Sequence, residues 1–428
     1  MTRYDDAAAL LENDAAALLE NDEAALPLAP RAAQPAAVIR DEHEALQVAR
    51  RLADELAVGA VRRDRDRILP WREVEAFSQS GLWGITIPKA YGGAEVSAGV
   101  LAQVVATIAA ADGNFGHIPQ NHFYSLEVLR VGGSEEQKAF FYDRVLRGER
   151  LGNALAEIGH KDFKRRTHLL REPDGWYVEG SKFYCTGAIF AHWIPTLVSA
   201  QDPDGERQYL VFVPREADGV EITDDWDGFG QRVTGSGSVR FRRVRVDPAW
   251  VVPFQTSFDR PTTIGPFAQI IHAALDAGIG HGALAATLPF VREHARPWID
   301  AGVERASDDP LLLEQLGNVH LRLRAADALI ARAARLVDAA QQAPDEESVA
   351  QASIAVAQAK ALSTSASLLA GNKLFELSGT GATLDGLGLD RFWRNARVHT
   401  LHDPVRWKYH AIGNYALNGV RPPRHGAL

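Results

Sequence analysis

The spacing of apolar residues changes twice along the chain, and this change restricts the possible folds more than any other feature. Over residues 39–150 apolar side chains recur at helical intervals. Over residues 151–255 the period becomes two, and turn pairs such as Asp174-Gly175 separate the runs. The helical period then returns over residues 262–420, in three long segments at about 267–296, 309–342 and 345–378. The sequence therefore predicts an α+β protein with an N-terminal helical domain, a middle antiparallel β domain and a C-terminal helical domain.

The first 38 residues differ from the rest. Residues 7–14 and 15–22 repeat one octet, and several prolines follow in an Ala-rich context. An eight-residue repeat matches no solenoid period, so we predict a mobile tail. A short amphipathic helix that docks on another protein is the alternative.

Composition excludes several classes of protein. Lys and Arg total 46 against 55 Asp and Glu, so the net charge of -9 gives no reason to expect nucleic acid or an anionic membrane as a partner. The single cysteine excludes a disulfide framework. No apolar run reaches the roughly 18 residues of a membrane-spanning helix, and the N-terminus is acidic. We expect a cytoplasmic protein, and the broad Ala-lined helices favour an oligomer.

Nucleotide-binding motifs are weak or absent. The sequence has no Walker A motif, and residues 278–283 form only a partial dinucleotide fingerprint that lies inside a predicted helix. Close packing of helices on small residues explains these glycines better. We therefore expect no Rossmann-type nicotinamide site in this chain.

Histidines are the strongest candidates for chemistry. Among 14 histidines, His399 and His402 are three residues apart, and Asp403 and Pro404 then break the helix. Imidazoles beside a carboxylate suit general acid and base catalysis near neutral pH. Without an HExxH order or a nearby carboxylate triad a metal site is not predicted. The alternative is that these are structural histidines at a helix end.

Two glycine-containing turns could approach a cofactor. Thr186 and Gly187 end a predicted strand, where a hydroxyl can hydrogen-bond a flavin ring nitrogen, although such a pair is often only a turn. Ser378, Gly379 and Thr380 end a long helix, where glycine is usually a C-cap.

Five short segments together resemble the acyl-CoA dehydrogenase superfamily: residues 81–93, 134–138, 182–187, 375–381 and 394–397. Each is weak alone, but all five occur in the family's order across the three predicted regions. The resemblance implies a helical N-terminal domain, a β-barrel-like middle domain and a C-terminal four-helix bundle. It also implies a homotetramer with flavin at the subunit interface.

The departures from the dehydrogenase pattern suggest a different activity. Asp403 falls where dehydrogenases of the family carry the glutamate base, and the dehydrogenase flavin strand is replaced by Gly152-Asn153-Ala154. Both replacements resemble the flavin-dependent monooxygenase branch, which includes dibenzothiophene monooxygenases and sulfur-acquisition oxidoreductases. That branch also shares the motifs at residues 185–188, 226–232 and 399–402.

The resemblance implies a role for each matching residue. Thr186, with Gly187, would hydrogen-bond the flavin N5 region, and Asn153, with Ala154, would contact the isoalloxazine. His402 and His117, with His399 and Asp403, would manage the proton of a C4a-hydroperoxyflavin. Three aromatic residues would form apolar walls of the substrate pocket, and four residues would reach the flavin from a neighbouring subunit. The walls are Phe123, Trp226 and Phe229, and the interface residues are Arg296, Ser378, Gly379 and Thr380.

The function that this resemblance implies is a two-component monooxygenase. It would use reduced FMN from a separate NADH-dependent reductase, and it would oxygenate a small organosulfur compound with molecular oxygen. FAD is the alternative cofactor. The alternative functions are an N-hydroxylating monooxygenase, an acyl-CoA dehydrogenase with FAD and Asp403 as base, and a non-enzymatic protein on the same fold.

Overall fold

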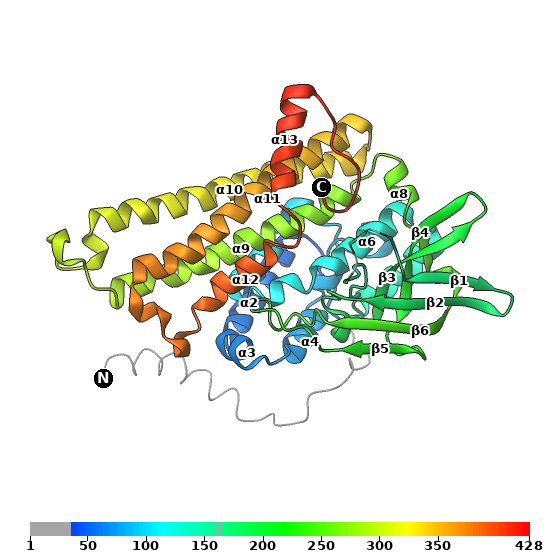
Figure 1. Ribbon diagram of the computed structural model, residues 1–428, viewed down its shortest axis with the longest axis horizontal. Coiled ribbons are helices and arrows are strands. Elements are labelled where there is room, and N and C mark those ends of the chain that lie inside the picture. Colours follow the sequence, from blue (N-terminus) through cyan, green and yellow to red (C-terminus); the bar gives the residue numbers. More distant parts are fainter. Residues whose placement is uncertain (1–35, 160, 163) are drawn as a thin grey trace.

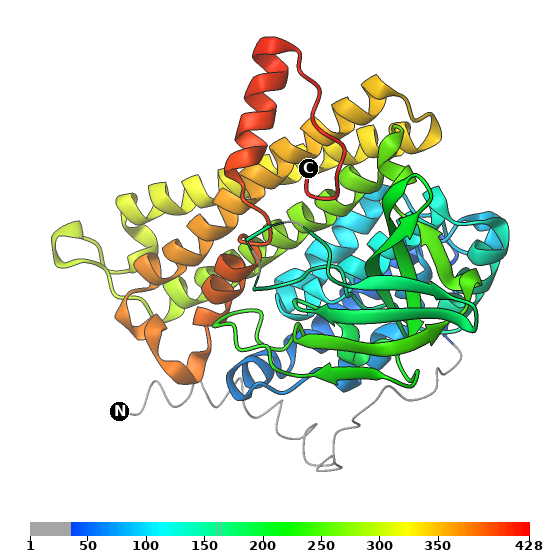
Figure 2. The ribbon, with the colours of Figure 1, turned by 45° about the vertical axis from the view of Figure 1, so that its right-hand side comes forward.

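The computed structural model describes residues 36–428 except residues 160 and 163. The predicted tail, apart from its last residues, therefore lies outside the described residues. Figure 1 shows a β-sheet at one end of the molecule, N-terminal helices beside it, and long C-terminal helices that extend away from the sheet. The turned view in Figure 2 shows the same three groups.

The N-terminal region is helical, as predicted, and local capping explains where its helices begin. The Asp41 side chain accepts a hydrogen bond from the Glu44 backbone at the start of the first helix. Ser134 and Gln137 form a capping box at the start of the last one. The helices are α2 (Glu42–Ala57), α3 (Ala60–Asp66), α4 (Trp71–Gln79), α5 (Ala98–Ala111), α6 (Gln120–Gly132) and α7 (Glu135–Leu146), with the short 3-10 helix η3 (Phe115–His117) between α5 and α6.

The middle region is a β domain, as predicted, but it forms one open, mixed sheet instead of the predicted antiparallel β-barrel. The order of the described strands is β5-β6-β2-β1-β3-β4-β7. Neighbours are antiparallel except β1 and β3, which pair in parallel through His168 and Ser199. The edge strands β5 and β7 are short and pair only inward, so no ladder joins the two edges. The strands are β1 (His168–Glu172), β2 (Gly175–Lys182), β3 (Trp193–Asp202), β4 (Gly205–Pro214), β5 (Val220–Thr223), β6 (Ser238–Val246) and β7 (Val251–Pro253).

The C-terminal region contains three long helices at the predicted places, but they do not form a four-helix bundle on their own. Two shorter helices follow the long ones, and the fourth helix packed against the central α9 is α5 of the N-terminal region. The two regions therefore share one interior. The helices are α8 (Thr256–Asp259), α9 (Ile264–Glu293), α10 (Pro310–Gln342), α11 (Glu346–Ser378), α12 (Asp390–His399) and α13 (Arg406–Asn418).

Small residues bring α9 close to α5, as the glycine pattern predicted. A Cβ atom added at Gly278 would lie 2.4 Å from the Ala106 carbonyl oxygen, and one added at Gly282 would lie 2.4 Å from that of Ala110. α9 is also the one helix of the described residues that is long and apolar enough to cross a membrane, and most of it is buried in the protein. Its apolar composition is therefore that of a core helix.

Candidate active site

Four imidazoles from separate elements meet where α9, α12 and η3 converge. His272 lies on α9, His399 ends α12, His402 follows that helix and His117 ends η3. The ring centroids of His272 and His402 are 4.0 Å apart, and those of His117 and His399 are 4.9 Å apart. The structure thus brings the three predicted histidines together and adds His272 to them.

The buried carboxylate of Asp276 is hydrogen-bonded to this histidine cluster. Asp276, one turn after His272 on α9, is hydrogen-bonded through Oδ1 to Nδ1 of His399. Its other oxygen accepts from Lys360 Nζ at 2.6 Å and from the Thr364 hydroxyl at 2.8 Å. Nε2 of His399 in turn lies 3.0 Å from Nδ1 of His272. A continuous row of hydrogen bonds therefore joins α11 to the histidine cluster.

The environment favours the neutral form of three of these imidazoles, His117, His272 and His399. Burial, together with His399 and His402, holds the pKa of His117 well below its usual value. Burial and the same two neighbours do the same for the pKa of His272. Burial would raise the pKa of Asp276, but Lys360 and His399 outweigh it and lower that pKa to about 2. The site thus holds neutral bases beside one buried anion whose charge Lys360 balances.

Asp403 is buried between His402 and Lys408. Its Oδ1 accepts from His402 Nδ1 at 2.9 Å, and its Oδ2 lies 3.3 Å from Lys408 Nζ. Burial would raise the pKa of Asp403, but the hydrogen bond from His402 and the charge of Lys408 outweigh it and hold that pKa far below its usual value. Burial in turn lowers the pKa of Lys408 to about 8. Asp403 therefore orients His402 through Oδ1, while its Oδ2 lies near the charge of Lys408 and has no hydrogen-bond partner among the described residues.

A row of hydroxyl groups connects the predicted flavin strand to the histidines. The Thr186 hydroxyl lies 2.7 Å from that of Ser236, which lies 2.5 Å from that of Thr234. Thr234 donates to the backbone carbonyl of Gln231 at 2.9 Å. The side-chain oxygen of Gln231 accepts from His117 Nδ1 at 2.9 Å. Thr186 and His117 thus belong to one hydrogen-bonded network.

The other strand-end residues lie near Thr186. The Asn153 side chain is half-buried and donates to the carbonyl of Tyr184 at 3.2 Å. Ala154 is buried and forms a parallel bridge to Thr196 of β3. Gly187 has φ +75°, a conformation that side chains rarely adopt. The structure therefore brings Asn153, Ala154, Thr186 and Gly187 to the same end of the sheet.

The predicted aromatic walls are not all at the site. Trp226 is half-buried and donates from Nε1 to the Gln231 carbonyl at 2.8 Å, so it borders the hydroxyl row. Phe229 is exposed and stacks on Trp393 at 6.1 Å between centroids. Phe123 is fully buried in the core, beside Trp83. Within this chain Phe123 therefore supports the fold from behind the site.

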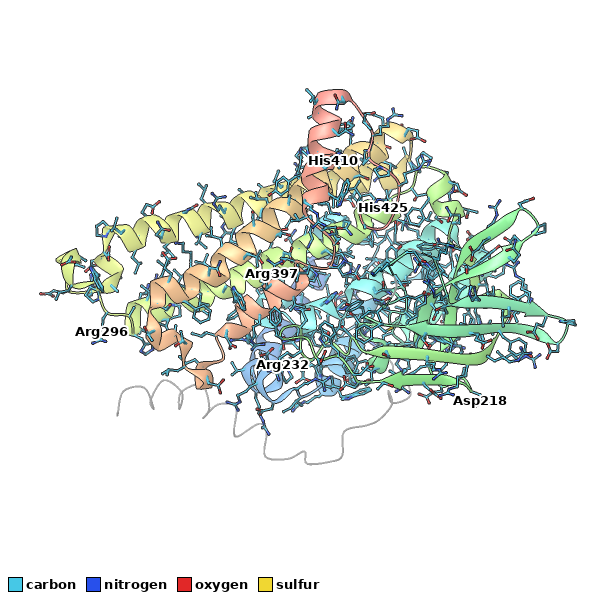
Figure 3. All side chains as sticks on the ribbon, viewed as in Figure 1. Asp218, Arg232, Arg296, Arg397, His410 and His425 are labelled. Carbon is cyan, nitrogen blue, oxygen red and sulfur yellow. The ribbon has the colours of Figure 1, made fainter. Side chains whose placement is uncertain are left out.

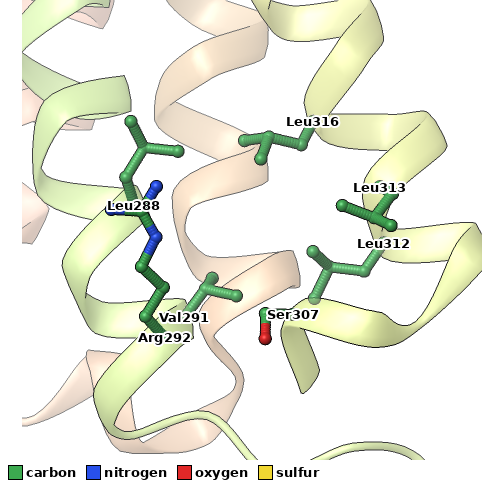
Figure 4. Close-up of a pocket in the computed structure, with 7 residues that line it drawn as sticks. All are labelled: Leu288, Val291, Arg292, Ser307, Leu312, Leu313 and Leu316. Carbon is green, nitrogen blue, oxygen red and sulfur yellow. The ribbon is translucent and has the colours of Figure 1, made fainter. Parts of the chain in front are cut away.

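The predicted interface residues lie far from the histidine cluster. Figure 3 shows Arg296 at the free end of the long helices, whereas Arg397, on the helix that carries His399, lies near the middle of the molecule. Gly379 and Thr380 are exposed, and the Ser378 hydroxyl is buried without a hydrogen-bond partner among the described residues. Between the end of α9 and the start of α10 lies a hollow of about 190 Å³ (Figure 4), lined by Leu288, Val291, Arg292, Ser307, Leu312, Leu313 and Leu316. Among the described residues, no hydrogen bond or ion pair joins Arg296 or residues 378–380 to Thr186.

The residues near the strand end fit a flavin. The hydroxyl of Thr186 and the amide of Asn153 are neutral donors and acceptors of the kind that can hold a flavin ring. In the neighbouring histidine cluster, one ring nitrogen of each of His117, His272 and His402 lies within 4.8 Å of the others.

Sequence reasoning missed the buried half of the site. His272, Asp276, Lys360 and Thr364 sit inside long Ala-rich helices, where the apolar pattern dominates. A signal did exist, because an aspartate and a lysine on the buried faces of two helices require partners. Gln231 was part of a recognised motif, but the sequence assigned it no contact to His117.

Comparison with known proteins agrees with this geometry. Residues 40–149 match the N-terminal domain of acyl-CoA dehydrogenases, and residues 270–407 match the C-terminal domain. Dibenzothiophene monooxygenase from Rhodococcus erythropolis is 34% identical over 396 residues, which cover 89% of this chain and 95% of that protein. The chain belongs to the monooxygenase branch of the acyl-CoA dehydrogenase family. The predicted family and branch are thereby confirmed.

Other members of the branch are similar along the whole chain. The probable FMNH2-dependent monooxygenase SfnC of Pseudomonas putida is 32% identical over 389 residues, which cover 88% of this chain and 96% of SfnC. The crystal structure of FMN-bound TdsC from Paenibacillus sp. A11-2 superposes with a TM-score of 0.86 at 33% identity, covering 90% of this chain and all of TdsC. The present chain therefore has the same fold as an FMN-bound relative of known structure.

Proposed function

We propose that this protein is a two-component, FMNH2-dependent monooxygenase that oxygenates an organosulfur compound in sulfur acquisition. The relatives' names support the reaction class and the flavin. Reduced FMN, when bound, activates molecular oxygen for transfer of one oxygen atom to the substrate.

One observation carries the choice between oxygenation and dehydrogenation. Asp403, at the position of the dehydrogenase base, is buried and bound by both His402 and Lys408. A base that removes a proton from carbon must reach the substrate and needs a pKa near the working pH. Asp403 is buried and its pKa is held far below its usual value, which argues against the acyl-CoA dehydrogenase alternative.

Different residues of the chain would then bind the flavin, transfer the proton and contact the substrate. Thr186 and Asn153, with Ala154 and Gly187, would hold the flavin ring at the strand end. His402 and His117 would hold or move a proton in the site, and His399 and Asp403 would orient them. Trp226 would line the substrate side. The neutrality of the buried imidazoles suits this role, because a neutral ring can accept a proton and return it.

We further propose a homo-oligomer, in which Arg296 and residues 378–380 approach the flavin of a neighbouring subunit. Large apolar side chains on the outer faces of α10 and α13 support this, including Leu311 at 76%, Leu321 at 68% and Leu417 at 84% exposure. A separate NADH-dependent reductase would supply reduced FMN in the cytoplasm.

The test is oxygenation by the purified protein with FMN, NADH and a separate flavin reductase, with dibenzothiophene and small sulfinates as substrates. The expected result is an oxygenated product that contains one oxygen atom from ¹⁸O2 and disappears in the His402→Ala variant. Tightly bound FAD that acyl-CoA reduces under nitrogen, without any reductase, would overturn the proposal.

A further inference from the structure

Asp276, His399 and His272 form a buried row of hydrogen bonds. The other partners of Asp276 determine which atom is the donor in each of these bonds. Lys360 and Thr364 both donate to Oδ2 of Asp276, so Oδ1 is the oxygen left for His399. An ionised carboxylate can only accept a hydrogen bond, so Nδ1 of His399 carries a hydrogen. A neutral imidazole has one N–H, and Nε2 of His399 must therefore be an acceptor.

The same argument applies to His272, the next ring in the row. Nδ1 of His272 lies 3.0 Å from the acceptor Nε2 of His399, so Nδ1 of His272 must be the donor. Its Nε2 is then unprotonated, and the ring lies against His402 and His117. The carboxylate thus determines the protonation of an imidazole two hydrogen bonds away.

We propose that Asp276, acting through His399, fixes His272 as a proton acceptor that faces the active site. This rests on the proposed monooxygenase function and extends it to Asp276 and His272, which neither the sequence nor the relatives' names assign. Asp276 and His399 are positioning residues, and His272 is the ring that receives the proton.

The row can also take up a proton without moving its own heavy atoms. When a proton binds Nε2 of His272 from the active-site side, the hydrogen on Nδ1 of His272 passes to Nε2 of His399 along their hydrogen bond. His399 then carries the positive charge beside Asp276, and no bond other than N–H bonds forms or breaks. The reverse transfers release the proton from Nε2 of His272, so the row serves as a temporary proton store.

Charged groups on every neighbouring element keep the stored proton short-lived. His272 is faced by His117 from η3, His399 from α12, His402 from the following turn and Lys360 from α11. All four oppose a charge on His272, and only Asp276, through His399, favours one on the row. We therefore expect both rings to be neutral at pH 7 in the resting protein.

Substitution of Asp276 by asparagine would reverse the row. The asparagine oxygen would take the place of Oδ2, because Lys360 and Thr364 donate there, and the amide nitrogen would face Nδ1 of His399. Nδ1 of His399 would then accept a hydrogen bond from the amide, so His399 would carry its hydrogen on Nε2. Because that Nε2 would donate to Nδ1 of His272, His272 would carry its hydrogen on Nε2 as well. The site-facing atom of His272 would change from an acceptor to a donor.

The experiment is ¹⁵N NMR of histidine-labelled protein, in which protonated and unprotonated ring nitrogens have separate shifts; His272→Gln identifies the signal. The expected wild-type result is an unprotonated Nε2 on His272, and Asp276→Asn should move the hydrogen to that atom. Asp327→Asn is the matched control, because Asp327 pairs with the half-buried His281 on the same α9. A wild-type His272 with hydrogen on Nε2, or doubly protonated at pH 7, would overturn the inference without any variant.

Turnover then separates this inference from the proposed function. Asp276→Asn should lower turnover about 10²- to 10⁴-fold, while reduced-FMN binding and the Asp327→Asn activity stay at wild-type levels. A reversed ring with unchanged turnover would contradict the inference alone. A wild-type protein that oxygenates nothing but shows the expected tautomers would contradict the proposed function alone.

Discussion

At the scale of single residues, two substitutions of Thr186 test the roles of its hydroxyl group and its methyl group separately. Thr186→Ser keeps the oxygen beside Ser236, whereas Thr186→Val keeps the shape and loses the hydrogen bond. We expect Thr186→Val to lower the oxygenation rate about 10²-fold and Thr186→Ser to lower it little, as measured with saturating reduced FMN. Equal rates for the two variants would exclude a role for the hydroxyl.

His122 gives the stability of the protein a dependence on pH. Its Nδ1 accepts from the Leu151 backbone at 3.0 Å and its Nε2 donates to the Trp83 carbonyl at 2.9 Å, so both nitrogens are engaged by a neutral ring. Burial lowers its pKa from 6.5 to about 3. In this window the unfolded chain binds a proton that the folded protein does not bind, so stability falls as the pH falls below 6.5.

The expected slope follows from linkage. The unfolding free energy should decrease by up to about 1.4 kcal/mol per pH unit for this one ring. Urea unfolding between pH 6.5 and 5 measures the slope. His122→Gln, whose amide can make the same two bonds, should show a smaller slope, and an unchanged slope would mean that His122 does not titrate on unfolding.

At the scale of elements, the close contact of α9 with α5 depends on glycine. An alanine Cβ at Gly278 would lie 2.4 Å from a backbone oxygen, which the two helices cannot relieve without separating. Gly278→Ala should therefore destabilise the protein by about 1–3 kcal/mol. Gly317 on α10 is the control, because its added Cβ meets nothing within 4 Å among the described residues. Gly317→Ala should stabilise by about 0.5–1 kcal/mol in the same denaturation experiment.

The sequence predicts elements well where the signal is local. Capping residues and apolar periods place the helices to within a few residues, because caps such as Ser134 act on their own turn. The parallel contact of β1 with β3 and the packing of α5 on α9 are long-range, and no local pattern encodes them. Likewise His399 and His402 are visible as a pair, whereas His272 and Lys360 come together only through the packing of α9 and α11.

At the scale of the whole molecule, the distance between Arg296 and the histidine cluster allows a test of the proposed shared site. If one flavin contacts Thr186 of one subunit and Arg296 of another, Thr186→Val and Arg296→Glu damage different halves of each site. We expect either variant alone to lose activity, and co-expressed subunits of both kinds to recover part of it. Mixed oligomers no more active than the two variants assayed separately would indicate a site built within one chain.

The row of hydroxyls from Thr186 to Gln231 also has a polarity. A carbonyl can only accept, so Thr234 donates to it, Ser236 donates to Thr234 and Thr186 donates to Ser236. Thr186 therefore offers a ligand a lone pair, and the N5 atom carries a hydrogen in reduced flavin but not in oxidised flavin. We expect the protein to bind reduced FMN more tightly than oxidised FMN, as measured by anaerobic titration. Ser236→Ala should narrow that difference, whereas Ser238→Ala, whose hydroxyl donates to Asp225, should not. Such a redox filter would release the spent cofactor and admit the next reduced one.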